Sequence, residues 1–359
     1  MTYTLIQAWR AVLCISVVLA HIKIYLLRGG SPSLFEYVPD IFGGIPCAFF
    51  TVSGYFMATL VDRNTKNFLP QRLVRVYPMY LLAILLAFLL RLFTTQPLDM
   101  EDLPLAISLL PLGPRINYKL GIEWTLVYEI FYYLICWVFC RPTLSRRFPA
   151  FLIVWMLAVL VKNIVAPFTP PLPTVLTIWL SGWNYCFIGG ALLFYAMQRY
   201  NEPATQAWAQ ALVFATLCIV SHTFMLRQGV FYLLGLGSCA VMAGLIRLES
   251  RVRSPKLLAE LGDYSYALYL IHTNIILLAF DRWAYFTEAR PGLVAGLIAL
   301  VLCLAGFWFL GQLDVAIHKR TRRWVNARFA DGRLAWMDRS LADGRLAWLR
   351  RLLEAGPPA

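Results

Sequence analysis

Three side chains capable of acid–base chemistry lie inside long apolar runs of this sequence. His21 and His272 each interrupt an apolar run, and Glu129 interrupts an aromatic one. An ionisable side chain at membrane depth is energetically expensive, so it needs a partner or a cavity. Neutral histidine can take a proton near neutral pH, and a carboxylate can orient it or stabilise its protonated form. The structural alternative for each residue is a buried contact that only ties helices together.

Arginines accompany these residues at helical spacings. Arg10 precedes His21 by eleven positions, so the helix rise separates them by ~16 Å. With Arg10 at a membrane surface, His21 is then expected near the middle of the hydrocarbon. Arg72 and Arg75 stand three residues apart, which places both guanidinium groups on one helix face, able to grip phosphate. The alternative for this pair is that they only mark a cytoplasmic loop.

Less specific polar candidates are Ser53, Trp124 and Tyr128. Ser53 is followed by Gly54, and the alternative for that pair is close helix packing. Trp124 and Tyr128 also fit an aromatic belt at the membrane interface. No Walker loop, dinucleotide fingerprint, nucleophile elbow or metal-ligand spacing occurs, and the cysteines have no metal-type or disulfide-type spacing. We therefore expect no bound metal and no permanently bound cofactor.

The composition shows what kind of chain must position these residues. Of 359 residues, 60% are hydrophobic and 14% are charged, and the mean hydropathy is +0.65. Such values are typical of a polytopic membrane protein and exclude an ordinary soluble domain. The net charge of +13 is then better explained by basic cytoplasmic loops than by a nucleic-acid partner.

The apolar runs predict an all-α membrane protein with about ten membrane-spanning helices. The expected spans are 6–27, 40–61, 73–93, 122–140, 150–166, 176–197, 208–226, 229–247, 262–281 and 291–317. The Pro-rich piece 103–113 is too short to span and is expected to be interfacial or re-entrant, with an eleventh span as the alternative. The first run lacks a cleavage site and is predicted to be retained in the mature protein.

The distribution of Lys and Arg predicts the orientation. With the N-terminus in the cytoplasm, the most basic loops all fall inside, namely residues 63–75, 141–147, 199 and 247–256, together with the C-terminal tail. We therefore predict both termini cytoplasmic, a transmembrane domain over 1–317 and a basic tail over 318–359. The segment Ala330–Trp336 recurs as Ala342–Trp348, which fits either amphipathic turns on anionic lipid or a solvated basic tail.

Ordered motifs in this sequence resemble those of the acyltransferase-3 family of integral membrane acyltransferases, which modify bacterial surface glycans. The likeness covers about residues 6–317, without a fused soluble catalytic domain. It rests on Arg10 with His21, Phe49-Phe50 with Ser53-Gly54-Tyr55, Arg72 with Arg75, Trp124 to Glu129, and Ser265-Tyr266 through His272. Three departures from the family pattern are Thr125 in place of a serine, Asn274 in place of a proline, and the larger Leu13 and Cys14 after the first arginine.

The resemblance implies transfer of an acyl group, usually acetyl, from cytoplasmic acyl-CoA to a hydroxyl of an extracytoplasmic or lipid-linked glycan. His21 would be the general base, with an acyl-histidine intermediate equally allowed, and Glu129 would assist it. Substrates would be bound by Arg10, Ser53, Arg72, Arg75, Trp124, Tyr128 and His272. The expected location is the bacterial inner membrane, with membrane lipids, glycan-assembly proteins or a second copy as further partners.

Two other classes of function remain open at this point. A transporter or flippase for a lipid-linked or anionic solute would use the same buried charges, but such proteins show repeated halves with broken helices, and the sequence has no such repeat. A non-catalytic scaffold for glycan assembly has no need of an arginine, a histidine and a glutamate together. Turnover of acyl-CoA by the purified protein would separate the enzyme from both.

Overall fold

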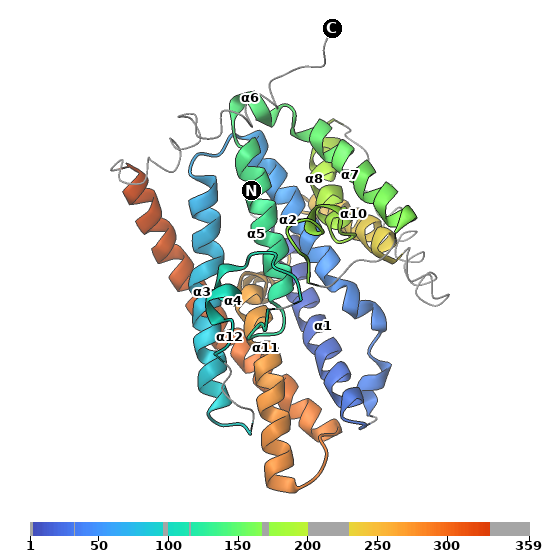
Figure 1. The fold of residues 1–359 in the computed structure, drawn as a ribbon, viewed down its shortest axis with the longest axis vertical. Coiled ribbons are helices and arrows are strands. Elements are labelled where there is room, and N and C mark those ends of the chain that lie inside the picture. Colours follow the sequence, from blue (N-terminus) through green and yellow to red (C-terminus); the bar gives the residue numbers. More distant parts are fainter. Residues whose placement is uncertain are drawn as a thin grey trace.

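The computed structural model describes residues 3–31, 33–95, 100–114, 116–166, 172–199 and 230–330. The regular secondary structure of these residues is helical, with turns and loops between the helices and one isolated β-bridge between Leu112 and Thr174. The predicted all-α class is therefore confirmed for the described part of the chain (Figure 1).

Most of the predicted spans correspond to a helix. These helices are α1 (Thr4–Arg28), α2 (Ile45–Asp62), α3 (Phe68–Arg91), α5 (Glu123–Phe139), α7 (Phe148–Val165), α8 (Asn184–Arg199), α10 (Val230–Leu248), α11 (Lys256–Thr287) and α12 (Leu293–Ala330). The predicted span 208–226 and the tail repeat lie outside the described residues. Within the described ranges, five helices are long and apolar enough to cross a membrane, namely α1, Phe42–Asp62, α3, α7 and the span Leu293–Arg328. The chain is a multi-pass membrane protein, while the number of ten spans and the orientation stay predictions.

The last two helices are longer than the sequence predicted. α11 has 32 residues and α12 has 38, so at ~1.5 Å per residue α12 is far longer than a ~30 Å hydrocarbon core. The predicted boundary at residue 317 falls inside α12, which continues through it to Ala330. Part of the expected tail is therefore an extension of the last helix.

The Pro-rich piece 103–113 forms only the short helix α4 (Leu103–Ser108). Two tyrosines of α3 hold it in place, because the hydroxyl of Tyr77 donates to the carbonyl of Ser108 at 3.0 Å and that of Tyr80 to Ala106 at 2.9 Å. Six residues cannot cross a bilayer. This agrees with the expected non-spanning segment.

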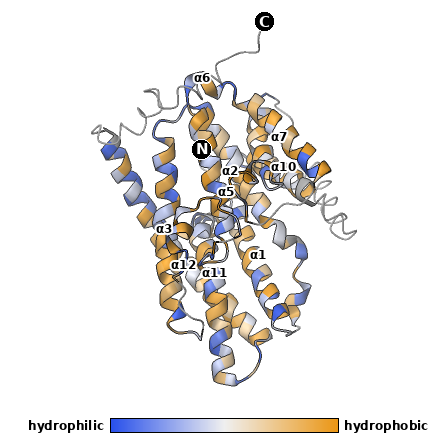
Figure 2. Cartoon of the chain, viewed as in Figure 1, coloured by the Kyte–Doolittle hydropathy of each residue, from blue (hydrophilic) through white to orange (hydrophobic). Residues whose placement is uncertain are grey.

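The helices lie in three groups, as Figure 1 shows: α3 beside α12, α7 with α8 and α10 on the opposite side, and α1, α2, α5 and α11 between them. Hydrophobic residues cover the middle of most helices, and hydrophilic residues gather at helix ends such as the end of α12 (Figure 2). Small residues allow the closest approaches. A Cβ on Gly54 would lie 2.0 Å from the carbonyl oxygen of Phe187, so α2 and α8 touch backbone to backbone there.

Helix α1, which contains Arg10 and His21, is fixed at its start by a distant carboxylate. The backbone N–H groups of Thr4 and Leu5 donate to the carboxylate of Glu249 at 2.6 and 2.9 Å. The first N–H groups of a helix have no partner within the helix, so an acidic side chain there both satisfies them and favours the helix dipole. Glu249 therefore anchors the helix on which the predicted base lies.

Candidate active site

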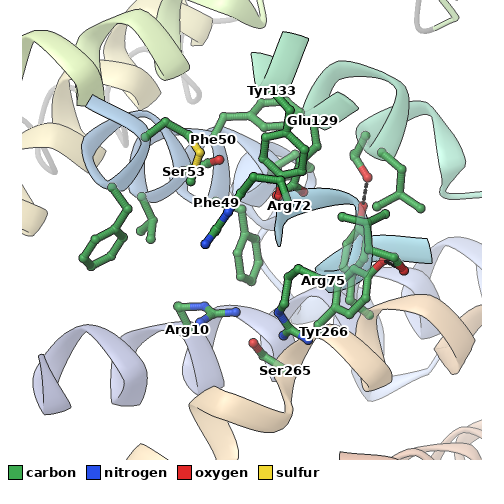
Figure 3. Close-up of a pocket in the computed structure, with 18 of the residues that line it drawn as sticks. Arg10, Phe49, Phe50, Ser53, Arg72, Arg75, Glu129, Tyr133, Ser265 and Tyr266 are labelled. Carbon is green, nitrogen blue, oxygen red and sulfur yellow. Dashed lines mark hydrogen bonds between the residues drawn. The ribbon is translucent and has the colours of Figure 1, made fainter. Parts of the chain in front are cut away.

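A cavity of about 370 Å³ lies among α1, α2, α3, α5 and α11. Its wall combines aromatic side chains with a small set of polar ones, and Figure 3 shows the arginines converging on the same space from α1 and α3. The polar side chains of the wall include Gln7, Arg10, Ser53, Arg72, Arg75 and Glu129. The structure therefore brings together five of the residues that the sequence predicted for the site, from the four helices α1, α2, α3 and α5.

Arg75 is held by a buried partner that the sequence did not predict. Its Nη1 lies 2.9 Å from both carboxylate oxygens of Asp314 on α12, whose side chain is only 2% exposed. The guanidinium also lies 4.9 Å from the centre of the Tyr266 ring. Asp314 therefore balances the charge of Arg75 and fixes its direction.

Arg10 and Arg72 have no such counter-ion. Arg10 donates to the side-chain oxygen of Gln7 at 2.9 Å, and neither arginine forms an ion pair within the described residues. Both are close enough to Glu129 to interact with it electrostatically. Three arginines and one glutamate leave the wall with an excess of positive charge, which suits an anionic ligand.

Glu129 faces this cavity from α5 and accepts a hydrogen bond from the hydroxyl of Tyr133, one turn further along the helix. Side chains four residues apart share a helix face, which explains why both line the same wall. In the described structure Glu129 forms no hydrogen bond to His21. The expected pairing of these two residues is therefore absent from the described structure, and Glu129 lines the arginine-lined cavity instead.

His21 and His272 meet outside that cavity. Nδ1 of His21 lies 3.3 Å from Nε2 of His272, and the two ring centres are 4.8 Å apart. Neither ring lines the cavity wall. The expectation that both histidines and Glu129 surround one cavity is therefore wrong for the described cavity: the histidines form a separate pair about three helix turns along α1 from Arg10.

Backbone carbonyls determine which nitrogen of each histidine holds the proton. Nδ1 of His272 lies 2.8 Å from the carbonyl oxygen of Tyr269 and 3.2 Å from that of Leu268, so it must donate. Its Nε2 then holds the lone pair and accepts from Nδ1 of His21, which also donates to the carbonyl of Val17 at 3.0 Å. The remaining nitrogen of His21, Nε2, therefore holds a lone pair and has no hydrogen-bond partner among the described residues.

An aromatic wall separates the cavity from the histidine pair. Tyr269 lines the cavity, and its ring centre is 5.9 Å from that of His272 and 6.1 Å from that of Phe49. The hydroxyl of Tyr269 is hydrogen-bonded to Thr125 at 2.8 Å. Tyr269 therefore lies between the cavity and the histidine pair.

A close helix crossing sets the register of the histidine pair. A Cβ on Gly262 of α11 would lie 1.9 Å from the carbonyl oxygen of Gln7 on α1, so only glycine permits this approach. Further along, the thiol of Cys14 donates to the carbonyl of Ser265 at 3.3 Å. From this contact both helices continue for seven residues, about two turns, which brings His21 opposite His272.

Two predicted substrate-binding residues are packed elsewhere. Trp124 lies against Trp183, with ring centres 4.8 Å apart, and the buried hydroxyl of Tyr128 donates to Ser181 at 2.7 Å. Neither belongs to the cavity wall. Ser53, by contrast, lines the cavity, while its neighbour Gly54 provides the packing contact with α8.

Five residues that support the site were assigned no role from the sequence: Gln7, Asp314, Tyr133, Tyr266 and Tyr269. Two of them left a signal. Asp314 is an acidic residue within the last predicted span, and Tyr133 stands one helix turn from Glu129. In the described part of the chain, no group of three or more His, Cys, Asp or Glu side chains could hold a metal ion.

Comparison with known proteins gives one family. A family model described as an acyltransferase domain matches residues 4–312, which includes every residue of the cavity and of the histidine pair. No curated protein and no solved structure matches the chain significantly.

Proposed function

The chain belongs to the acyltransferase-3 family of membrane acyltransferases, and we propose that it transfers an acyl group, acetyl in the first instance, from cytoplasmic acyl-CoA to a hydroxyl of an extracytoplasmic or lipid-linked glycan. The proposed location is the bacterial inner membrane. The observation that supports the reaction most directly is the contact between Nδ1 of His21 and Nε2 of His272, because it leaves Nε2 of His21 free to take a proton.

The arginine-lined cavity is the proposed donor site. A thioester of coenzyme A has phosphates at one end and a long, flexible pantetheine arm at the other. Arg72 and Arg10 offer guanidinium groups without an ion pair in the described structure, and such groups bind phosphate oxygens well. Arg75 is already neutralised by Asp314, so we expect it to position the donor less strongly than Arg72 does.

The proposed chemistry takes place at the histidine pair. The acceptor hydroxyl loses its proton to Nε2 of His21 as its oxygen attacks the thioester carbonyl. The tetrahedral intermediate then collapses, the C–S bond breaks, and the departing thiolate receives the proton from His21. The new C–O bond gives the ester, the thiol is released, and the histidine returns to its starting state.

The two halves of the site are joined by the pantetheine arm. With the phosphates at Arg72, the acyl end would move past Tyr269 to reach His21, which stands ~16 Å along α1 from the level of Arg10. The acceptor would approach from the opposite membrane face. Neither whole substrate then needs to cross the membrane.

The test uses purified full-length protein in lipid nanodiscs, supplied with acetyl-CoA and a panel of glycans, together with mass analysis of surface glycans after deletion of the gene. We expect release of free thiol that depends on the acceptor, and loss of an acetyl-sized mass from one surface glycan in the deletion strain. A transporter or a scaffold would show no thioester cleavage, so a lack of turnover with every glycan, and unchanged surface glycans, would contradict the proposal.

A further inference from the structure

The end of α12 continues the basic wall of the cavity outward. This part of the chain lies after residue 312, where the family match ends. This extension is the stretch from His318 to Arg328, which is strongly basic. It lies along α3, because the side chain of Gln71 donates to that of Asn326 at 3.2 Å and Asp314 pairs with Arg75 one turn before the extension starts. The extension therefore begins beside the cavity wall.

The register of α12 places a basic group near the arginines of the cavity. Asp314, His318 and Arg322 follow one another at intervals of four residues, so they share one helix face. Asp314 contacts Arg75, and Arg322 is close enough to Arg72 and His318 to interact electrostatically with both. The side chain of Arg322 is exposed, so an incoming ligand can reach it.

The opposite border of this surface is basic too. Lys319 is exposed and lies within electrostatic range of Asp263 on α11, which in turn interacts with Arg10. Between these helices, Nδ1 of His318 is buried and has no hydrogen-bond partner among the described residues. An unpaired buried nitrogen is costly and needs a partner such as an anion or a water molecule.

The charges in this region do not balance. Arg10, Arg72, Arg75, Lys319 and Arg322 lie near four acidic side chains, Glu129, Glu260, Asp263 and Asp314, so one positive charge remains in excess. Like charges held close together repel one another, and a bound anion removes that cost. The arrangement therefore has the chemistry of a phosphate site that continues the cavity outward.

We propose that Lys319 and Arg322 of α12, together with Arg72, bind the phosphate groups at the nucleotide end of the acyl donor. The inference rests on the proposed function, because it assigns a binding site to the part of the acyl-CoA donor that lies outside the cavity. A cavity of about 370 Å³ suits the pantetheine arm and leaves the nucleotide at the mouth. The site would select donors that have a nucleotide over those that have only pantetheine.

Arg322→Glu and Arg320→Glu form a matched pair for the test. Both change one arginine of the same exposed helix into glutamate, but residues two apart point ~200° apart around the helix axis. Within the described part of the chain, Arg320 is exposed and forms no ion pair, and it faces away from the shared face of Asp314 and Arg322. Any effect of general charge is therefore common to both variants, whereas an effect of the site appears in only one.

The first measurement is direct binding of adenosine 3′,5′-bisphosphate to the full-length protein in phosphatidylcholine nanodiscs. Charge-assisted hydrogen bonds support an expected loss of about tenfold in affinity for Arg322→Glu. Arg320→Glu should bind as wild type does. Equal losses in both variants, or none in either, would overturn the site. An effect on binding to anionic lipid vesicles without one on the nucleotide would identify a lipid-headgroup site instead.

The second measurement compares two donors. Arg322→Glu should raise KM for acetyl-CoA by about the same tenfold factor and leave KM for S-acetylpantetheine unchanged, since that donor lacks the nucleotide. An equal rise for both donors would contradict the proposal. If wild-type protein used neither donor, the proposed function would fail, while the binding measurement would still decide whether the phosphate site exists.

Discussion

Nδ1 of His21 lies 3.3 Å from Nε2 of His272, and this contact joins α1 to α11. The carbonyls of Leu268 and Tyr269 force the proton of His272 onto its Nδ1. His272 is therefore a neutral acceptor, and it occupies the position relative to His21 that a carboxylate has in many hydrolytic sites. It leaves the lone pair of His21 on Nε2, the nitrogen that is proposed to act as the base.

His272 is expected to act as a positioning residue, and its replacement can show this. His272→Leu removes the acceptor for Nδ1 of His21, whereas His272→Gln leaves an amide oxygen that can accept in its place. We expect kcat to fall by roughly tenfold to a hundredfold for Leu, and to recover most of the way for Gln, with KM for acetyl-CoA unchanged in both. Steady-state kinetics of the purified variants measures this. Equal loss in both variants would mean that His272 is only a packing residue.

Replacing His21 should cost more than replacing His272. His21→Ala removes the base itself, so transfer should fall by roughly a hundredfold to ten-thousandfold. Protein level and donor binding should persist, because His21 does not line the arginine cavity. Glycan acylation in cells and thioester cleavage by purified protein both report the loss. Near-normal transfer by the variant would reduce His21 to a helix–helix contact.

The helices could be predicted because apolar runs of sufficient length must be helical in a membrane. The ends of α11 and α12 could not, since neither helix stops where its apolar run stops. Polar residues continue the same helices, and Asp314 and Asn326 find partners on α3. Hydropathy measures where a helix is buried in lipid and says nothing about where it ends in water.

The site could be predicted only as a set of residue types. Helix spacing correctly placed Arg72 and Arg75 on one face, and depth correctly placed His21 and His272 at similar levels. Which residues would touch depended on the crossing of Gly262 with Gln7, a backbone contact that no spacing shows. For the same reason Glu129 fell on the arginine side of Tyr269, and not beside His21.

The orientation in the membrane is tested with single cysteines in a cysteine-free background. Thr65 lies in the basic connection between α2 and α3, and Glu288 follows the end of α11. Because basic loops stay in the cytoplasm, a membrane-impermeant maleimide should label Glu288→Cys in intact cells and label Thr65→Cys only after lysis. The opposite pattern would invert the topology and place the arginine cavity on the outer side.

Glu129 should affect the rate through the charge of the cavity. Glu129→Gln keeps the shape and an oxygen that Tyr133 can donate to, but it removes a negative charge that interacts with both Arg10 and Arg72. We expect most of the transfer rate to be lost while the protein level stays normal. Tyr133→Phe is the control, since it removes one hydrogen bond and keeps the carboxylate. A Gln variant as active as wild type would leave Glu129 as a helix contact only.

Arg72→Ala should weaken donor binding without destabilising the fold. Arg72 has no ion pair in the described structure, so its removal breaks none, and Arg10 remains within electrostatic range of Glu129. Losing one charge-assisted contact to phosphate should raise KM for acetyl-CoA roughly tenfold. Arg72→Lys should recover only part, because an ammonium group lacks the planar fork. An unchanged KM would make Arg72 a marker of topology.

Arg75 should behave differently from Arg72 because of Asp314. Arg75→Met leaves the carboxylate of Asp314, only 2% exposed, without its partner, and an unpaired buried charge costs about 3 kcal/mol. Adding Asp314→Leu removes that charge, so the double variant should regain most of the lost stability in thermal unfolding. Donor affinity then separates the two roles: we expect it to stay reduced in the double variant, whereas wild-type affinity there would mean that Arg75 serves the fold alone.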